Sequence, residues 1–182
     1  MTKSKFKNIG VLGGSFDPPH KGHLYISNKS LKLLKLEKII WAITKKNPLK
    51  KKSFFSFEMR KKMCLKLINR SKKIHLRYYE DKIKSNTSVA LIKHLKKQKN
   101  YNIFYIIGSD NLLNLHKWKD FKNLIKMTKL IVFSRKGFDT KAKKSVIFKY
   151  LKKENFKFFK NMGIDISSTR LRNKIIDGSK KN

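Results

Sequence analysis

The feature that most constrains the fold is a regular alternation of short apolar runs with longer stretches of helical spacing. Four of these runs are almost wholly apolar, at residues 8–13, 38–44, 103–107 and 130–133. Strands that are buried on both faces have this composition. Two further strands are expected at 74–79 and 155–160. Strands that alternate with helices form parallel sheets covered on both sides, so the sequence predicts an α/β fold with one doubly wound parallel sheet.

Helices are expected between these strands because apolar residues recur there at helical spacing. The predicted helices cover residues 21–35, a segment capped by Ser56, 87–97, one or two short helices in 110–125, 142–153 and 167–176. After Ser56, the residues Met59, Met63 and Leu67 form one apolar stripe. No repeat or linker divides the chain, which predicts a single domain over residues 1–182 with a frayed polar tail at 178–182.

The net charge is large, but it decides little about function. Lys and Arg number 47 against 11 Asp and Glu, giving +36, and only six of the 47 are Arg. A basic chain attracts polyanions. Nucleic-acid readers also use arginine forks and aromatic platforms, and the lysines here are scattered with neither feature visible. We therefore expect no specific nucleic-acid partner, while a basic nucleic-acid-binding module remains the alternative from a different class.

Cysteine content and hydropathy exclude further classes. The single Cys64 excludes an internal disulfide framework and a cysteine-based zinc cluster. The longest apolar run, residues 39–43, is too short to cross a bilayer, and no leader pattern opens the sequence. We expect a cytoplasmic protein with no membrane partner.

The first strand runs into a turn whose residues favour phosphate binding. It reads Gly13-Gly14-Ser15-Phe16-Asp17-Pro18-Pro19-His20-Lys21-Gly22-His23. Glycines let the backbone approach a ligand closely. His20 and His23 are three residues apart at a helix start, where both rings can face one anion and the helix dipole favours it. The alternative is a surface turn with incidental histidines.

Three segments resemble the nucleotidyltransferase superfamily that carries the HxGH motif. The motif is His20-Lys21-Gly22-His23 here, and the second signature resembles Ile166-Ser167-Ser168-Thr169-Arg170-Leu171-Arg172. Between them, Ile107-Gly108-Ser109-Asp110-Asn111 is similar to that family's glycine–aspartate segment. Trp118 and the loop at 45–50, with Asn47-Pro48-Leu49-Lys50, are similar to the subgroup that adenylylates nicotinate mononucleotide.

This resemblance implies a Rossmann-like fold and an adenylyl transfer from ATP to nicotinate mononucleotide. The implied products are nicotinate adenine dinucleotide and pyrophosphate, in NAD biosynthesis. Direct in-line attack needs positioning and charge stabilisation and no covalent enzyme intermediate. The sequence has no cluster of paired acids, so Mg²⁺ is expected to arrive with ATP and no protein metal site is expected. Phosphopantetheine adenylyltransferase and other nucleotidyltransferases of the superfamily remain alternatives.

The resemblance also assigns residues to the ATP site. His20, His23 and Arg172 are the expected catalytic residues, with the two histidines on the ATP phosphates. The other residues expected to bind ATP are Gly14, Ser15, Phe16, Gly108, Asp110, Ser168 and Thr169. By spacing, Arg172 rather than Arg170 matches the signature arginine. Asp17 could hold Mg²⁺ or brace the turn, and we favour bracing.

The mononucleotide site is expected to use a second group of residues. Trp118 is similar to the aromatic that stacks on the pyridine ring, with a core position as the alternative. Thr87 could offer a hydroxyl or amide to the nicotinate carboxylate, or could simply cap a helix. Three basic or polar residues complete the expected set: Lys45, Asn47 and Arg135.

Overall fold

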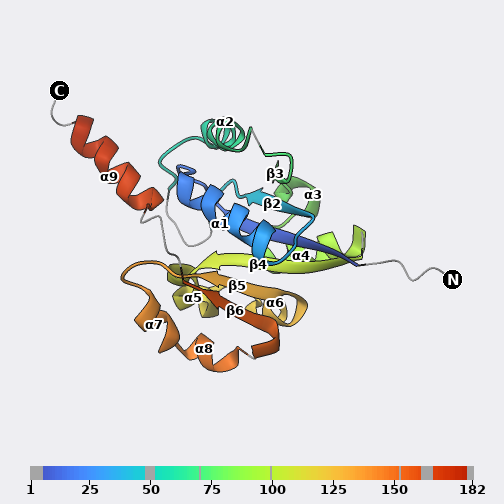
Figure 1. Ribbon diagram of the computed structural model, residues 1–182. Coiled ribbons are helices and arrows are strands. Elements are labelled where there is room, and N and C mark those ends of the chain that lie inside the picture. Colours follow the sequence, from blue (N-terminus) through green and yellow to red (C-terminus); the bar gives the residue numbers. More distant parts are fainter. Residues whose placement is uncertain are drawn as a thin grey trace.

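Six parallel strands form one sheet with the order β3-β2-β1-β4-β5-β6 (Figure 1). The computed structural model describes residues 6–47, 52–69, 71–98, 100–151, 153–160 and 166–179. The strands are β1 (Lys7–Gly14), β2 (Lys38–Ile43), β3 (Ile74–Arg77), β4 (Tyr101–Gly108), β5 (Lys129–Phe133) and β6 (Phe156–Phe159). All five strand pairings are parallel. The predicted fold class is therefore confirmed.

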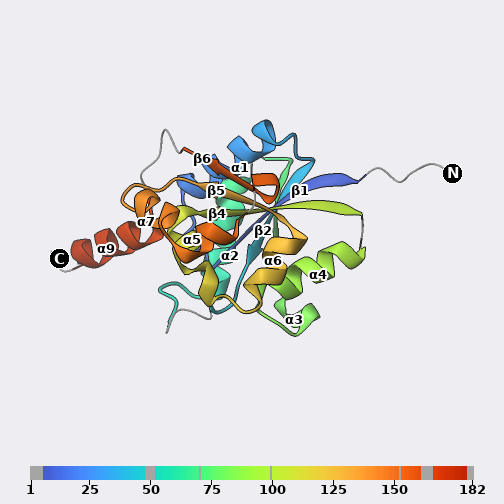
Figure 2. The ribbon, with the colours of Figure 1, turned by 90° about the horizontal axis from the view of Figure 1, so that it is seen from below.

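Helices cover both faces of this sheet. One face packs against α1 (Lys21–Leu33) and α2 (Phe57–Ile68). The other face packs against α4 (Ser88–Gln98), α5 (Ser109–Asn114), the 3₁₀ turn η1 (Leu115–Lys117), α6 (Phe121–Met127), α7 (Asp139–Lys143) and α8 (Val146–Tyr150). Figure 2 shows α1 and α4 on opposite sides of the strands. No helix in the described ranges is long and apolar enough to cross a membrane.

The sheet reverses its winding between β1 and β4, and this fixes the place for a ligand. The chain moves from β1 to β2 and β3 in one direction, then returns to β4 on the other side of β1. Ligands of such sheets bind at this switch point, beyond the carboxyl ends of the strands. The last helix, α9 (Ser168–Ser179), extends away from the same end of the sheet in Figure 1.

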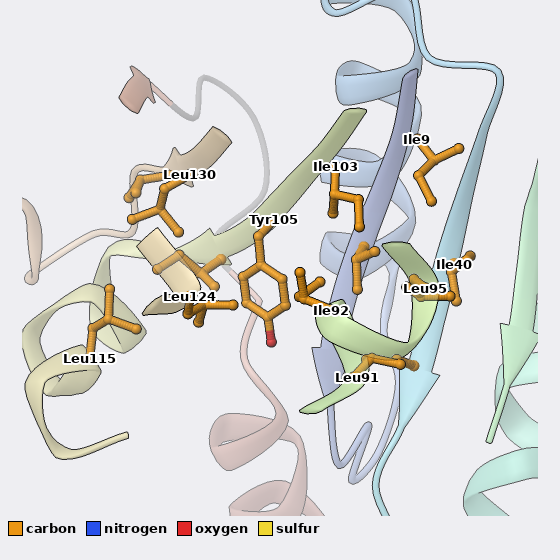
Figure 3. Close-up of a cluster of buried hydrophobic side chains, with 14 of the residues drawn as sticks. Ile9, Ile40, Leu91, Ile92, Leu95, Ile103, Tyr105, Leu115, Leu124 and Leu130 are labelled. Carbon is orange, nitrogen blue, oxygen red and sulfur yellow. The ribbon is translucent and has the colours of Figure 1, made fainter. Parts of the chain in front are cut away.

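A separate apolar core lies on each face. In the core beneath α4, Tyr105 is surrounded by aliphatic side chains that include Ile92 and Leu124 (Figure 3). Its hydroxyl lies 2.7 Å from Ser88 Oγ, so its one polar group has a partner in this apolar setting. The second core, beneath α1 and α2, contains Trp41 and Cys64. Cys64 is buried, and burial raises the pKa of its thiol to about 12, which makes it an inert core residue.

Three expectations about helices differ from the structure. Residues 142–153 do not form one helix, because Ser145 adopts an extended backbone (ψ 152°) between α7 and α8. A short helix α3 (Glu80–Ile83) and a 3₁₀ turn η2 (Lys153–Asn155) were not expected, and both are too short to show helical periodicity. Helix α9 continues to Ser179, into the segment predicted to fray, and residues 180–182 lie outside the described ranges.

The stripe predicted for α2 is one residue out of phase with the buried face, so that Met63 and Leu67 lie at its edge, partly buried. Met59 is exposed, while the buried positions are Arg60, Cys64 and Ile68, one residue further along. Apolar spacing did not detect this face because its first member is an arginine.

Candidate active site

The turn after β1 leads into α1 through two histidines that cap the helix. The backbone amide of Gly22 donates to Nδ1 of His20 at 3.1 Å, and the amide of His20 donates to Nδ1 of His23 at 3.1 Å. The two imidazole rings are 3.8 Å apart between centroids. This reciprocal arrangement has the form of a capping box, in which side chains satisfy the unpaired amides of the first turn.

These hydrogen bonds determine which nitrogen of each ring carries the proton. An Nδ1 atom that accepts from a backbone amide has no hydrogen, so the neutral ring carries its proton on Nε2. Each ring therefore has a donor left on Nε2 for a ligand. Burial lowers the pKa of His20 to about 4, helped by the charge of Arg135. Burial, His20 and Arg135 hold the pKa of His23 well below its usual value. The free site thus holds two neutral Nε2–H donors at neutral pH.

Gly22 is required by the ring of His20. A Cβ atom at Gly22 would lie 2.8 Å from Nδ1 of His20, so any side chain there would displace the imidazole from its capping position. The glycine of the motif therefore makes room for the capping histidine.

The start of α9 contacts the same turn. Ser168 Oγ donates to the carbonyl oxygen of Pro18 at 2.8 Å, and Arg172 Nη1 donates to that of Asp17 at 2.5 Å. Arg172 Nη2 also donates to Thr169 Oγ1 at 3.1 Å. The two signatures, at opposite ends of the sequence, thus meet in space as their chemistry requires.

A cavity of about 580 Å³ opens beside these segments at the carboxyl edge of the sheet. This volume lies within the ordinary range for small-molecule sites. Twelve of the fifteen residues assigned from the sequence line it: Gly14, Ser15, His20, His23, Asn47, Thr87, Gly108, Asp110, Trp118, Arg135, Ser168 and Thr169. Most of the residues assigned from the sequence therefore lie around one cavity.

The other three assigned residues, Phe16, Lys45 and Arg172, do not line the cavity. Phe16, with a left-handed backbone (φ 46°), turns its ring into the core, where it stacks on Trp41 with centroids 4.9 Å apart. Phe16 therefore presents only its backbone to the turn, and its expected contact with ATP stays a prediction for that backbone. Lys45 and Arg172 are not among the lining residues either, although Arg172 acts on the turn as described. Residues 48–50 of the basic loop lie outside the described ranges.

One wall of the cavity is aromatic. Trp118 packs edge to face on Tyr105, with centroids 6.2 Å apart and ring planes at 84°. Tyr105 in turn bonds Ser88, the residue after Thr87. A Cβ at Gly13 would lie 2.7 Å from the Tyr105 hydroxyl, so this glycine admits the ring. Tyr105 thus contacts both Ser88 and Trp118 and lies against the end of β1.

The loop after β5 places the positively charged side chain of Arg135 at the cavity. Arg135 Nη1 donates to Asp110 Oδ2 at 2.5 Å, and the two form an ion pair. The loop is anchored by Asp139, which accepts from the Arg135 amide at 2.9 Å, from Ser109 Oγ at 2.8 Å and from Ser134 Oγ. Burial alone would raise the pKa of Asp139, but these hydrogen bonds hold it below its usual value. The second oxygen of Asp110, Oδ1, is buried without a hydrogen-bond partner.

Asp17 braces the turn, as expected. Its carboxylate accepts from the amides of Phe54 and Phe55, at 2.8 and 2.9 Å. Among the residues that the structure describes, there is no group of three or more His, Cys, Asp or Glu side chains suited to a metal ion.

Two charged residues near the cavity, Arg60 and Glu80, were not predicted from the sequence to belong to the site. Arg60 is buried and donates to four backbone carbonyl oxygens, and Glu80 lines the cavity and binds the loop after β2. The arginine is one of 47 basic residues, and it lies outside the apolar stripe predicted for this helix. The one sequence signal for Arg60 is its spacing: it lies four residues before Cys64 and eight before Ile68, on the buried face of α2.

Comparisons with known proteins agree with this geometry. A family model described as cytidylyltransferase-like matches residues 11–174. A protein of Pelagibacter ubique (strain HTCC1062), named probable nicotinate-nucleotide adenylyltransferase, is 44% identical over 92% of this chain and 93% of its own length. A protein of Aquifex aeolicus (strain VF5) with the same name is 35% identical over 87% of this chain and 98% of its own.

A solved structure is also similar. It is described as Plasmodium falciparum nicotinic acid mononucleotide adenylyltransferase complexed with NaAD. It superposes with a TM-score of 0.75 at 25% sequence identity, covering 92% of this chain and 83% of that one. The matching family model spans both signatures and all the strands that hold the cavity. This chain therefore belongs to the cytidylyltransferase-like family.

Proposed function

We propose that the protein transfers the adenylyl group of ATP to nicotinate mononucleotide, giving nicotinate adenine dinucleotide and pyrophosphate. The observation that carries this proposal is the single cavity that joins the His20–His23 pair to the wall formed by Trp118 and Thr87. One end offers donors to a polyphosphate, and the other offers an aromatic face to a flat heterocycle. The names of the relatives support the same reaction.

In this proposal ATP lies with its phosphates against the first turns of α1 and α9. A phosphate oxygen of the mononucleotide attacks the α-phosphorus of ATP in line. The bond from that phosphorus to the oxygen bridging the β-phosphate breaks, and pyrophosphate leaves with the bonding electrons. The Nε2–H groups of His20 and His23 donate to phosphate oxygens as their charge grows, and Arg172 holds α9 against the turn.

The acceptor occupies the aromatic end of the cavity. The pyridine ring stacks on Trp118, and Thr87 offers its amide or hydroxyl to the nicotinate carboxylate. Asn47, Lys45 and Arg135 supply polar and positive groups for the phosphate of the mononucleotide. Asp110 and Gly108 lie on the adenosine side, where the buried Oδ1 of Asp110 is an acceptor for a ribose hydroxyl.

Mg²⁺ enters this site with ATP. A cation held by phosphate oxygens and water needs no protein cage, and it offsets phosphate charge during the transfer. We place the reaction in the cytoplasm, where ATP is available.

Pyrophosphate release tests the proposal. The purified protein is incubated with ATP and Mg²⁺, together with nicotinate mononucleotide, nicotinamide mononucleotide or phosphopantetheine in parallel reactions. We expect release with nicotinate mononucleotide and the formation of the corresponding dinucleotide. Release with phosphopantetheine alone, or with none of the three, contradicts the proposal.

A further inference from the structure

Arg60 is a buried cation in the middle of an apolar core. It comes from the inner face of α2 and is 1% exposed, beside Cys64. None of the ion pairs in the described ranges includes it. Its guanidinium instead donates to carbonyl oxygens alone, including that of Phe55 at 3.2 Å. Burial lowers the pKa of Arg60, while the charges of Asp17 and Glu80 oppose that shift.

One nitrogen of Arg60 joins two loops that come from different strands. Nη1 donates to the carbonyl oxygen of Ser15 at 2.6 Å and to that of Thr44 at 2.9 Å. Ser15 follows β1 in the phosphate-binding turn, and Thr44 follows β2. Both line the cavity, so their separation sets its width at this point.

Glu80 holds the same peptide from its other side. The Thr44–Lys45 peptide presents its carbonyl oxygen to Arg60 and its amide to Glu80 Oε2, at 3.1 Å. Glu80 Oε1 also accepts from the Thr44 hydroxyl, and Arg60 Nη2 donates to the next carbonyl, that of Lys45, at 2.8 Å. A planar trans peptide directs its two polar groups to opposite sides, so a cation and an anion hold it between them.

We propose that Arg60 and Glu80 are positioning residues that together hold the Thr44–Lys45 peptide against the Ser15 turn, and thereby align the acceptor mononucleotide with ATP. This inference rests on the proposed function. Neither residue needs to touch the reacting atoms. Asn47, two residues beyond this peptide, lines the cavity, so the held peptide fixes the start of the loop that meets the acceptor.

The cost of burying an arginine favours a positioning role for Arg60 over a role that only fills space in the apolar core. A buried arginine carries a desolvation penalty that an apolar side chain of similar size avoids. The five donors of a guanidinium form a rigid fork, which reaches several carbonyls at fixed angles, and an ammonium cannot reproduce it. Misplacement of reacting groups by about 1 Å can reduce a rate by about a hundredfold.

Kinetics of conservative variants test the pair. Arg60→Lys keeps the cation and removes the fork, and Glu80→Gln keeps the shape and removes the charge. We expect Glu80→Gln to raise KM for nicotinate mononucleotide about fivefold to tenfold, since a looser loop must be ordered on binding, with KM for ATP nearly unchanged. We expect Arg60→Lys to raise KM for nicotinate mononucleotide at least as much as Glu80→Gln does, and also to lower kcat by about tenfold to a hundredfold. The double variant should show no more than the Arg60→Lys effect on KM, because both groups act on one peptide.

Two variants serve as matched controls. Arg77→Lys makes the same change at an exposed arginine, whose guanidinium donates to the carbonyl oxygen of the neighbouring Leu76 at 3.0 Å. Ile103→Val weakens the buried core at the far end of β4. Both should keep the kcat and KM of the parent, even where Ile103→Val lowers Tm.

A readout that does not depend on turnover separates this inference from the proposed function. Hydrogen exchange of the Lys45 amide, which Glu80 protects, should accelerate at least about tenfold in Arg60→Lys without ligand. A parent without turnover overturns the proposed function and leaves this readout in place. Parent-like Lys45 exchange and KM in Arg60→Lys overturn the positioning role. If that variant does not fold, an unchanged KM for the mononucleotide in Glu80→Gln overturns it.

Discussion

The carbonyl oxygen of Asp17 accepts a hydrogen bond from Arg172 at 2.5 Å, although the two residues are 155 positions apart in the sequence. Ser168 makes a parallel bond to Pro18. The turn after the first strand and the first turn of the last helix are therefore one structural unit. The carboxylate of Asp17 is meanwhile held by two amides ahead of α2, so the turn is fixed from both sides.

Arg172→Ala tests this unit. We expect kcat to fall by about a hundredfold, because α9 no longer brings its first turn to the phosphates. Hydrogen exchange in α9 should accelerate at the same time. Lys174→Ala, an exposed change on the same helix, should alter neither quantity. An Arg172→Ala enzyme with parent-like kcat contradicts the role given to this contact.

His23→Ala tests the donor pair. Loss of one preorganised donor to developing phosphate charge typically lowers kcat by about 10² to 10³-fold, and we expect a loss of at least that order. The KM values should change much less, since the donor acts mainly in the transition state. Pyrophosphate release provides the measurement, with the exposed His116→Ala as its control. A nearly active His23→Ala protein means that the assigned role is wrong.

The sequence predicted most of the sheet and the outline of the cavity for one physical reason. Buried strands and a glycine-rich turn carry their signal within a few adjacent residues, as residues 8–23 show. The placements that the sequence did not predict depend on contacts between distant segments. Phe16 lies in the right turn, but its left-handed backbone sends the ring to Trp41. Arg60 is buried because carbonyls from three loops converge on it, and no local pattern encodes that convergence.

Gly22→Ala separates stability from catalysis. Inside a helix, alanine is favoured over glycine by about 1 kcal/mol, which opposes unfolding. The added Cβ would lie 2.8 Å from Nδ1 of His20, so the imidazole must move away. We expect kcat to fall by at least about tenfold while Tm stays the same or rises. Thermal unfolding and turnover are measured on one preparation, with Lys21→Ala as the neighbouring control. A large loss of Tm, or full activity, contradicts this account of the glycine.

Trp118→Ala tests the aromatic wall. Loss of a stacking face should raise KM for nicotinate mononucleotide about tenfold and leave KM for ATP nearly unchanged. Trp118→Phe keeps a ring and should retain most of the affinity. Tyr150→Ala removes an exposed aromatic outside the cavity and serves as the control. Equal increases of both KM values in Trp118→Ala indicate a core role for this side chain instead.

The depressed pKa of His20 predicts how stability depends on pH. The folded protein holds this pKa at about 4, against 6.5 for an unperturbed histidine. Between these values the unfolded chain binds a proton that the folded chain does not, so the free energy of unfolding falls as pH is lowered through this window. Above 6.5 both states are neutral, and His20 contributes no pH dependence.

His20→Asn isolates this contribution. Asparagine still accepts from the Gly22 amide as a helix cap but does not titrate. We expect its free energy of unfolding to fall less steeply than that of the parent between about pH 6.5 and pH 4. Urea unfolding at constant ionic strength measures both slopes, and the exposed His116→Asn should follow the parent. Identical slopes for His20→Asn and the parent would mean that the folded protein does not hold His20 neutral, and the tautomer argument for its Nε2 donor would fail with it.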